Sequence, residues 1–171
     1  MRRIIWALAL GGALMLGVKG KADELGDGAK LPAVTANDQN GKAVKLDQAG
    51  GKGFALVYFY PKADTPGCTK QACSLRDAYA QLTDKGIKVF GVSADSVQAQ
   101  KKFEAKYHLP FTLLADTDKK VMDAFGVPHT LGVAKRQAFL FEDGKLVWRD
   151  LTASTDKQAA DVLAAVAKLG G

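Results

Sequence analysis

Two cysteines, Cys68 and Cys73, are the only thiols in this sequence of 171 residues, and they lie five positions apart. A pair at this spacing can form a disulfide, bind a metal or carry redox chemistry. Cys68 follows the loop signal Pro66-Gly67, and a helical face continues from it at Ala72, Leu75, Tyr79 and Leu82. The first turn of a helix offers free N–H groups and the positive end of the helix dipole, which both favour a thiolate. We therefore expect Cys68 to be a nucleophile.

The loop before Cys68 carries further groups that suit this chemistry. Pro61 and Pro66 stiffen it, and Thr65 can direct its hydroxyl toward the sulfur. A thiolate surrounded by hydrogen-bond donors could hold a peroxide, because donors stabilise the charge that develops on the leaving oxygen. The product at sulfur would be a sulfenic acid.

The spacing of the cysteines also restricts how they can pair. In an α-helix a five-residue offset separates two Cα atoms by about 8–9 Å, whereas a disulfide needs less than about 7 Å. If Cys73 attacks oxidised Cys68, the first one or two helical turns must therefore unwind. The same geometry argues against a static disulfide. A zinc site is disfavoured because zinc cysteines are usually two to four residues apart, although His108 and His129 could serve as further ligands.

The composition is that of an ordinary globular domain, with 47% hydrophobic and 25% charged residues. The net charge is +6, but four positive charges, on Arg2, Arg3, Lys19 and Lys21, lie in the first 22 residues, so the remainder carries about +2. No dense stripe of Lys and Arg with interleaved aromatic residues is present. We therefore expect no nucleic-acid partner.

The chain starts like an exported protein. Met1-Arg2-Arg3 precedes an apolar run over 4–18, which is short for a membrane span, and Gly20-Lys21-Ala22 resembles a cleavage site. We predict a signal peptide over 1–22, cut after Ala22, with an uncleaved membrane anchor as the alternative. Residues 23–30 are then a linker and 31–171 the domain, placed in the periplasm or cell envelope.

The rest of the pattern predicts an α/β fold. Buried strands are expected at 54–60, 87–92 and 111–114, a hairpin at 137–149, and an N-terminal hairpin turning at Asn40-Gly41. Helices are expected from Cys68 to Gly86, after Asp95 or Ser96, over 119–125 with Asp116 and Asp118 before it, and from Ser154 or Thr155. This order predicts a mixed central β-sheet flanked by helices on both faces.

The motifs together resemble the peroxiredoxin Q group, also called bacterioferritin comigratory protein. The resemblance covers nearly all of the chain after the leader. It rests on Tyr58-Phe59-Tyr60-Pro61, Thr65-Pro66-Gly67-Cys68-Thr69, Ala72-Cys73, Leu75-Arg76-Asp77, Val89 to Asp95, Phe111 to Asp116, Phe125-Gly126-Val127 and Arg136 to Leu140.

This resemblance implies a thioredoxin-like fold and a thiol peroxidase that needs no cofactor or metal. Pro61, Thr65, Cys68 and Arg136 match the active-site residues of the family, and Cys73 matches the resolving cysteine of its atypical, single-chain form. A fixed arginine beside the thiolate would stabilise it and donate to peroxide oxygen.

Substrates and partners follow from the same resemblance. It implies hydrogen peroxide and organic hydroperoxides as substrates. A thioredoxin-like reductant of the envelope is expected from the compartment instead. A monomer suffices, because both cysteines lie in one chain. The leader departs from the family pattern and leaves the electron donor open, since cytoplasmic thioredoxin would not reach an exported protein. The connection from Pro128 to Lys135 is shorter than in some relatives.

Two other functions stay open. An envelope thiol–disulfide oxidoreductase would share the fold but favours Cys-x-x-Cys, and a copper-handling protein could use Cys68, Cys73 and His129. Neither explains Pro61, Thr65 and Arg136 together. Arg76 has two interpretations, a position facing the site or a surface salt bridge to Asp77 or Asp84.

Overall fold

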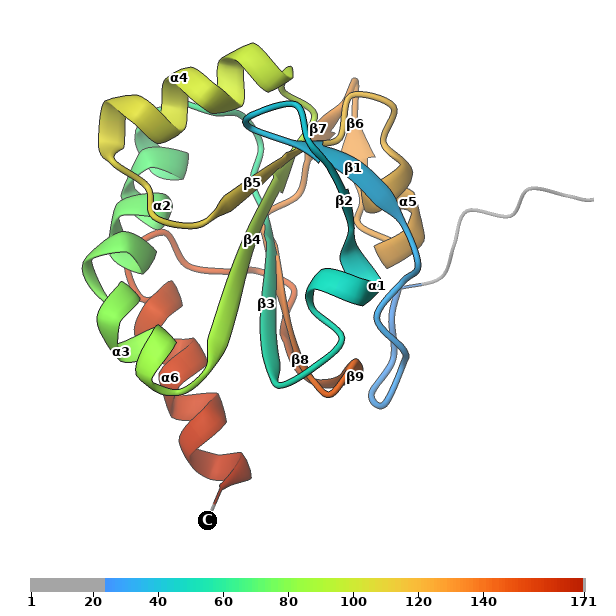
Figure 1. The fold of residues 1–171 in the computed structure, drawn as a ribbon, viewed down its shortest axis with the longest axis vertical. Helices are drawn as coiled ribbons and strands as arrows, with labels where there is room; N and C mark the ends of the chain where they lie inside the picture. Colours follow the sequence, from blue (N-terminus) through green and yellow to red (C-terminus); the bar gives the residue numbers. More distant parts are fainter. Residues whose placement is uncertain (1–23, 171) are drawn as a thin grey trace, which may run out of the picture.

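A seven-stranded sheet forms the centre of the protein in the computed structural model, which describes residues 24–170 (Figure 1). The predicted signal peptide and its cleavage after Ala22 lie outside these residues. The strand order is β2-β1-β5-β4-β3-β8-β9. The strands are β1 Thr35–Asp38, β2 Ala43–Lys45, β3 Phe54–Phe59, β4 Ile87–Ser93, β5 Thr112–Ala115, β8 Gln137–Glu142 and β9 Lys145–Asp150.

The sheet is mixed, as predicted. β3, β4 and β5 run parallel, whereas β1 and β2, β1 and β5, β3 and β8, and β8 and β9 pair antiparallel. β3 is buried from Ala55 to Phe59, which explains why its sequence is continuously apolar. The predicted N-terminal hairpin is present as β1 and β2, with Gly41 in the turn at a φ of 80°.

Helices cover both faces of the sheet. On one face, α2 Pro66–Asp77, α3 Tyr79–Asp84, α4 Val97–Tyr107 and α6 Gln158–Leu169 enclose one apolar core. On the other face, α1 Leu46–Ala49 and α5 Lys120–Phe125 enclose a second core (Figure 1). The sheet therefore separates two cores. Among the described residues, no helix combines the length and apolar character that a membrane crossing requires.

The single helix predicted from Cys68 to Gly86 is wrong. The helix is interrupted at Ala78, which lies between α2 and α3 and has a φ of −95° and a ψ of 8°. Hydrogen bonding continues across the break, since Ala78 N donates to Ser74 O and Leu82 N donates to Ala78 O. The apolar spacing is preserved through this break, so periodicity alone could not reveal it.

The last helix also starts later than predicted, at Gln158. Ser154 does act as a cap, but of a turn: its Oγ accepts from the N–H groups of Asp156 and Lys157. A short hairpin that the sequence did not predict, β6 His129–Thr130 with β7 Val133–Ala134, occupies most of the connection before β8. Its turn uses positive φ at Leu131 and Gly132.

The segment expected as a linker lies partly against the domain. Gly28 N donates to Leu146 O, and Leu146 N donates to Ala29 O along β9. Arg149 on β9 also binds Glu24 and the carbonyl of Leu25. The backbone pairing covers the beginning of the outer edge of β9, which would otherwise present free backbone groups.

Candidate active site

Cys68 lies where β3 and its following loop enter α2. Thr65, in an extended conformation, is the N-cap, and Pro66 takes the first helical position. The first helical bond runs from Thr69 N to Thr65 O at 2.8 Å. The N–H groups of Gly67 and Cys68 precede it and make no hydrogen bond within residues 24–170. Cys68 is only 2% exposed, so its thiol is buried at the beginning of α2, next to these N–H groups along the chain.

Arg136 brings a cation to this sulfur. It immediately precedes β8, and Gln137 pairs with Phe59 at the end of β3, so the sheet register carries Arg136 to the loop that begins at Tyr60. Its Nη2 donates to Cys68 Sγ at 3.5 Å, and its Nη1 donates to Gln71 Oε1 on α2. The rigid fork of the guanidinium can make both bonds at once, which a lysine could not do in the same way.

Thr65 and Pro61 lie in the loop that leads to Cys68. The Thr65 hydroxyl donates to Lys62 O at 2.9 Å, so in this structure its proton points into its own loop. The oxygen keeps acceptor capacity. Pro61 follows β3 and is half-buried. The structure thus brings Arg136 into direct contact with Cys68, whereas Thr65 acts on the loop conformation.

A buried polar network holds this loop against β4 and α4. Asp95 Oδ2 accepts from Ala63 N and from Ser93 Oγ, each at 2.7 Å. Ser93 Oγ also accepts from Gln100 Nε2 at 2.8 Å, and Gln100 Oε1 accepts from Tyr60 OH at 2.5 Å. Burial raises the pKa of Tyr60 above its ordinary value, which keeps the hydroxyl protonated as a donor.

Asp64 forms a second anchor in the same loop. Its φ of 59° lies in the left-handed region, which Asp tolerates better than most residues. Its carboxylate accepts two bonds from Lys106 Nζ at 2.8 Å and one from Tyr107 OH at 2.7 Å. The hydrogen bond from Lys106 is the main cause that holds the pKa of Asp64 below its usual value. Sequence reasoning missed this role, because these contacts span more than 40 residues.

Cys73 lies on the same helix as Cys68, and both thiols are free. It is half-buried and lines a groove of about 560 Å³ between α2 and α6, with Ser74, Ala78 and Leu163. Because the two cysteines lie five positions apart in an intact α-helix, this conformation keeps their sulfurs from bonding.

Other candidate residues lie away from the sulfur. Arg76 donates to Asp77 Oδ1 and to Tyr107 O, so the surface salt bridge is the correct interpretation. His129 bonds Asp123 at 3.1 Å, and His108 is the exposed left-handed residue that ends α4. Among the described residues, no three His, Cys, Asp or Glu side chains gather closely enough to hold a metal ion.

Asp116 has a structural role at α5. Its carboxylate accepts from the N–H groups of Val121 and Met122, each at 2.9 Å, as the prediction of an acidic helix start implied. Burial raises the pKa of Asp116 above the ordinary carboxyl value. The two hydrogen bonds lower the same pKa and so oppose the effect of burial. Because they satisfy N–H groups at the beginning of α5, the carboxylate caps this helix.

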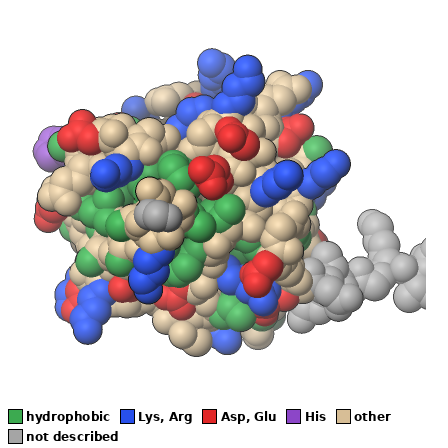
Figure 2. Space-filling view, turned by 90° about the horizontal axis from the view of Figure 1, so that it is seen from below, with side chains coloured by type: hydrophobic (Ala, Val, Ile, Leu, Met, Phe, Trp, Pro, Cys, Tyr) green, Lys and Arg blue, Asp and Glu red, His purple; other side chains and the backbone are tan. Residues whose placement is uncertain are grey.

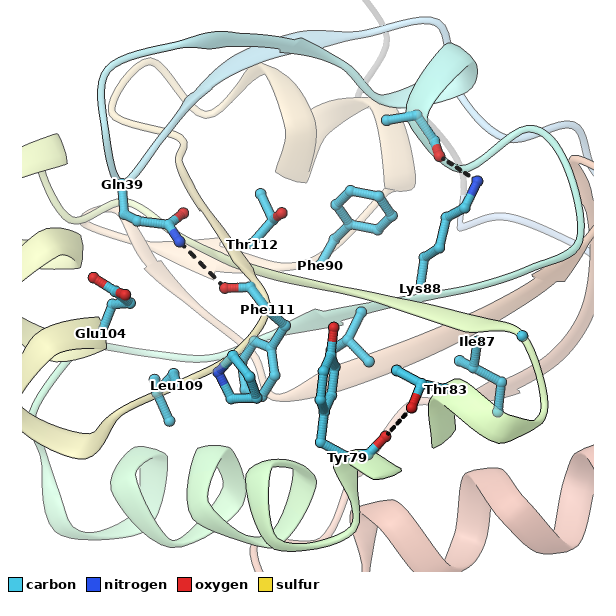
Figure 3. Close-up of a pocket in the computed structure, with 14 residues that line it drawn as sticks. Gln39, Tyr79, Thr83, Ile87, Lys88, Phe90, Glu104, Leu109, Phe111 and Thr112 are labelled. Carbon is cyan, nitrogen blue, oxygen red and sulfur yellow. Dashed lines mark hydrogen bonds between the residues drawn. The ribbon is translucent and has the colours of Figure 1, made fainter. Parts of the chain in front are cut away.

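A pocket of about 720 Å³ lies elsewhere, beside the beginning of β4 (Figure 3). Tyr79, Lys88 and Phe111 line it, and Gln39 donates to the Phe111 carbonyl at its rim. It contains neither cysteine and not Arg136. This pocket therefore lies apart from the candidate site at Cys68.

Comparisons with known proteins identify the family of this chain. Residues 28–149 match the model of the AhpC/TSA family. A putative peroxiredoxin bcp of Coxiella burnetii is 49% identical over 100 residues, covering 58% of this chain and 66% of that protein. Chloroplastic peroxiredoxin Q of Suaeda salsa is 42% identical over 126 residues, covering 72% of this chain and 58% of that protein. The matches thus span less than two thirds of these curated relatives.

Solved structures extend the likeness to the whole domain. Peroxidoxin BcpB of Mycobacterium tuberculosis aligns with a TM-score of 0.78 and 31% identity, covering 84% of this chain and 97% of that one. The bacterioferritin comigratory protein of Xanthomonas campestris aligns with a TM-score of 0.76 and 28% identity, covering 85% and 100%. The chain therefore belongs to the AhpC/TSA family, is similar to peroxiredoxins of the Q type, and has their thioredoxin-like fold.

Proposed function

We propose that the protein is a thiol peroxidase in which Cys68 attacks a peroxide. The observation that carries the proposal is the contact of 3.5 Å between Arg136 Nη2 and Cys68 Sγ, at a helix start where the N–H groups of Gly67 and Cys68 have no partner among the described residues. A cation and free donors around one sulfur favour its thiolate and can bind two adjacent oxygens.

The chemistry uses each of these groups. The Cys68 thiolate attacks one peroxide oxygen; the S–O bond forms as the O–O bond breaks, and the leaving oxygen takes a proton to become water or an alcohol. Arg136 and the free N–H groups stabilise the charge on that oxygen. Sulfur is oxidised to a sulfenic acid, and the peroxide is reduced. Thr65 and Pro61 shape the loop in which the peroxide binds.

Cys73 then resolves the intermediate. Its sulfur attacks the sulfenic sulfur of Cys68, a disulfide forms, and the hydroxyl leaves as water. Because α2 holds the two residues about 8–9 Å apart between Cα atoms, the first turns of α2 unwind before this step. An external dithiol returns both cysteines to thiols and is itself oxidised to a disulfide. One chain completes this cycle.

Substrate range and location are part of the same proposal. The structurally similar bacterioferritin comigratory protein of Xanthomonas campestris is described as having alkyl peroxide reduction activity, which supports organic hydroperoxides beside hydrogen peroxide as substrates here. The leader over 1–22 supports export to the periplasm or envelope. The reductant is then a thioredoxin-like dithiol protein of that compartment.

The test follows thiol loss after peroxide is added to the reduced protein. We expect stoichiometric loss of two thiols in the wild type, no fast loss in Cys68→Ser, and a stable sulfenic acid in Cys73→Ser that over-oxidises with more peroxide. Fast exchange with protein disulfides and slow reaction with peroxide would instead identify an oxidoreductase. Tight Cu(I) binding without peroxide reaction would identify a copper protein.

The motion of α2 has its own measurement. Hydrogen exchange of the amides in α2 should be slow in the reduced protein and fast in the disulfide form, while the sheet stays protected in both. Equal protection of α2 in the two forms would contradict resolution by unwinding.

A further inference from the structure

A chain of buried side-chain amides leads away from Arg136 into α6. Arg136 Nη1 donates to Gln71 Oε1, and Gln71 Nε2 donates to Gln158 Oε1 at 2.6 Å. Gln71 and Gln158 are both fully buried. Gln71 lies on α2 between the two cysteines, and Gln158 is the first residue of α6. The chain therefore connects the cation at Cys68 to a helix outside the active-site motif.

The direction of these bonds is fixed by the arginine. A guanidinium only donates, so Gln71 must present its oxygen to Arg136 and its NH₂ group to Gln158. Gln158 must in turn present its oxygen to Gln71. Its own Nε2 is buried and finds no acceptor within the described residues. Each amide orientation thus depends on the previous one, and Gln158 Oε1 is the acceptor that ends the chain.

Two further contacts join the same parts. Lys70 Nζ donates to Asp156 Oδ2 at 3.2 Å, and Ser74 Oγ donates to Asp156 O at 3.3 Å. We call Lys70, Gln71 and Ser74 on α2, with Asp156 and Gln158, the α2–α6 latch. All three α2 residues belong to the turns that contain or adjoin the cysteines.

The contacts of the latch differ in how strongly they hold α2 to α6. Lys70 and Asp156 are 60% and 52% exposed, and an ion pair at that exposure contributes little. The Ser74 contact is exposed as well. The Gln71–Gln158 bond is shielded from water, so breaking it leaves a buried amide without a partner. Gln158 therefore makes the strongest of the polar contacts between α2 and the segment that begins α6.

We propose that Gln158 is a positioning residue, which holds α2 folded through Gln71 and thereby sets how long oxidised Cys68 stays in the folded pocket. This inference rests on the proposed peroxidase function. While α2 is folded, the Cys68 sulfenate can attack a second peroxide; a second S–O bond forms, the O–O bond breaks, and a sulfinic acid and water or alcohol result. Once α2 unwinds, Cys73 captures the sulfur instead. The latch thus selects between over-oxidation and the disulfide.

The test variant is Gln158→Met, which keeps volume and helix propensity but removes the acceptor. The control is Val166→Ala on the same helix. Val166 is 8% exposed and lines a pocket with Phe54 and Leu169 near the end of α6. Figure 2 shows the molecule from below, the side on which α6 ends in Figure 1, and hydrophobic side chains gather on this face. The control loses apolar packing there and keeps the latch.

Hydrogen exchange on the reduced proteins tests the latch without any peroxide. Loss of the buried bond should raise the opening equilibrium of α2 by on the order of tenfold. Exchange of α2 amides in Gln158→Met should accelerate by this factor relative to β3 and β4, whereas Val166→Ala should show no such selective effect. Acceleration spread evenly over the domain, or absent from α2, would overturn the latch. This result does not depend on peroxidase activity, so it separates failure of the latch from failure of the proposed function.

The second readout is how much oxidised Cys68 becomes sulfinic acid and how much forms the disulfide with Cys73. Mass spectrometry under turnover gives the peroxide concentration at which half of Cys68 becomes sulfinic acid. That concentration should rise several-fold in Gln158→Met and stay at the wild-type value in Val166→Ala. An unchanged threshold in Gln158→Met, with α2 exchange accelerated, would overturn the role of Gln158 in selecting the product.

Discussion

Replacement of Arg136 by Met removes the cation at Cys68 while the side chain keeps a similar length. At 3.5 Å, two unit charges attract by about 5 kcal/mol at an effective dielectric constant of 20. Arg136 is only half-buried, so water screens part of this energy. Loss of one donor from an oxyanion site costs about 10²–10³ in rate. We expect the second-order rate constant of Cys68 with peroxide to fall by that factor.

The assay is thiol loss under excess hydrogen peroxide at several concentrations, measured in a Cys73→Ser background so that only Cys68 reports. Lys135→Met is the matched control, because it removes a neighbouring exposed cation that does not touch the sulfur. Arg136→Lys should lie between the wild type and Arg136→Met, since lysine keeps the charge but lacks the fork. A rate for Arg136→Met within threefold of the control would refute the role given to Arg136.

The contact between Arg136 and Cys68 can also be disturbed by a substitution at Gly67 on α2. A methyl group added at Gly67 would lie 3.3 Å from Arg136 Nη2, so Gly67→Ala pushes the guanidinium away from the sulfur. Alanine is also the better helix former, by about 1 kcal/mol. The variant should therefore react several-fold more slowly with peroxide while its thermal midpoint does not fall. A slower reaction together with a lower midpoint would point to general disruption instead.

Two further predictions concern the scaffold. At Gly91 an added Cβ would lie 2.7 Å from the Tyr58 hydroxyl, so Gly91→Ala should destabilise the domain by about 1–3 kcal/mol, measured by urea unfolding; an unchanged midpoint contradicts it. Asp64→Asn keeps the left-handed backbone but loses the charge that pairs with Lys106. The pKa of Asp64 is lowered in the fold, so its stabilisation is present above the ordinary carboxyl pKa and is lost as pH falls through the lowered value. The stability gap between wild type and Asp64→Asn should therefore be present at neutral pH and close in acid; a gap independent of pH would exclude the ion pair as its source.

Most of the candidate site could be located from the sequence because its signals are local. Cys68, Thr65 and the two prolines lie within eight residues, and the turn signal before a helical pattern places the sulfur at a helix start. Arg136 required the family resemblance, since only the pairing of β8 with β3 brings it there.

The supports of the site could not be predicted in this way. Asp95, Asp64 and Gln158 act through contacts across 32, 43 and 87 residues, and each resembles an ordinary cap or surface residue in the sequence. Hydrophobic periodicity likewise could not locate the break at Ala78, because α3 keeps the apolar phase of α2. Long-range polar pairing has no periodic signature, so only the folded structure reveals it.

The two carboxylates that fix the loop before Cys68 have a consequence for turnover. Asp95 and Asp64 anchor it to β4 and α4 through bonds that involve no residue of α2, so the proposed unwinding of α2 leaves these bonds in place. After reduction the chain has a preformed starting point from which to rebuild one or two helical turns. Helix formation takes about 0.1–1 μs in peptides, whereas enzymes commonly turn over about 1–10³ times per second. Refolding of α2 is therefore too fast to limit the proposed cycle, and the pace is left to the unwinding of α2, to the chemical steps and to the arrival of the reductant.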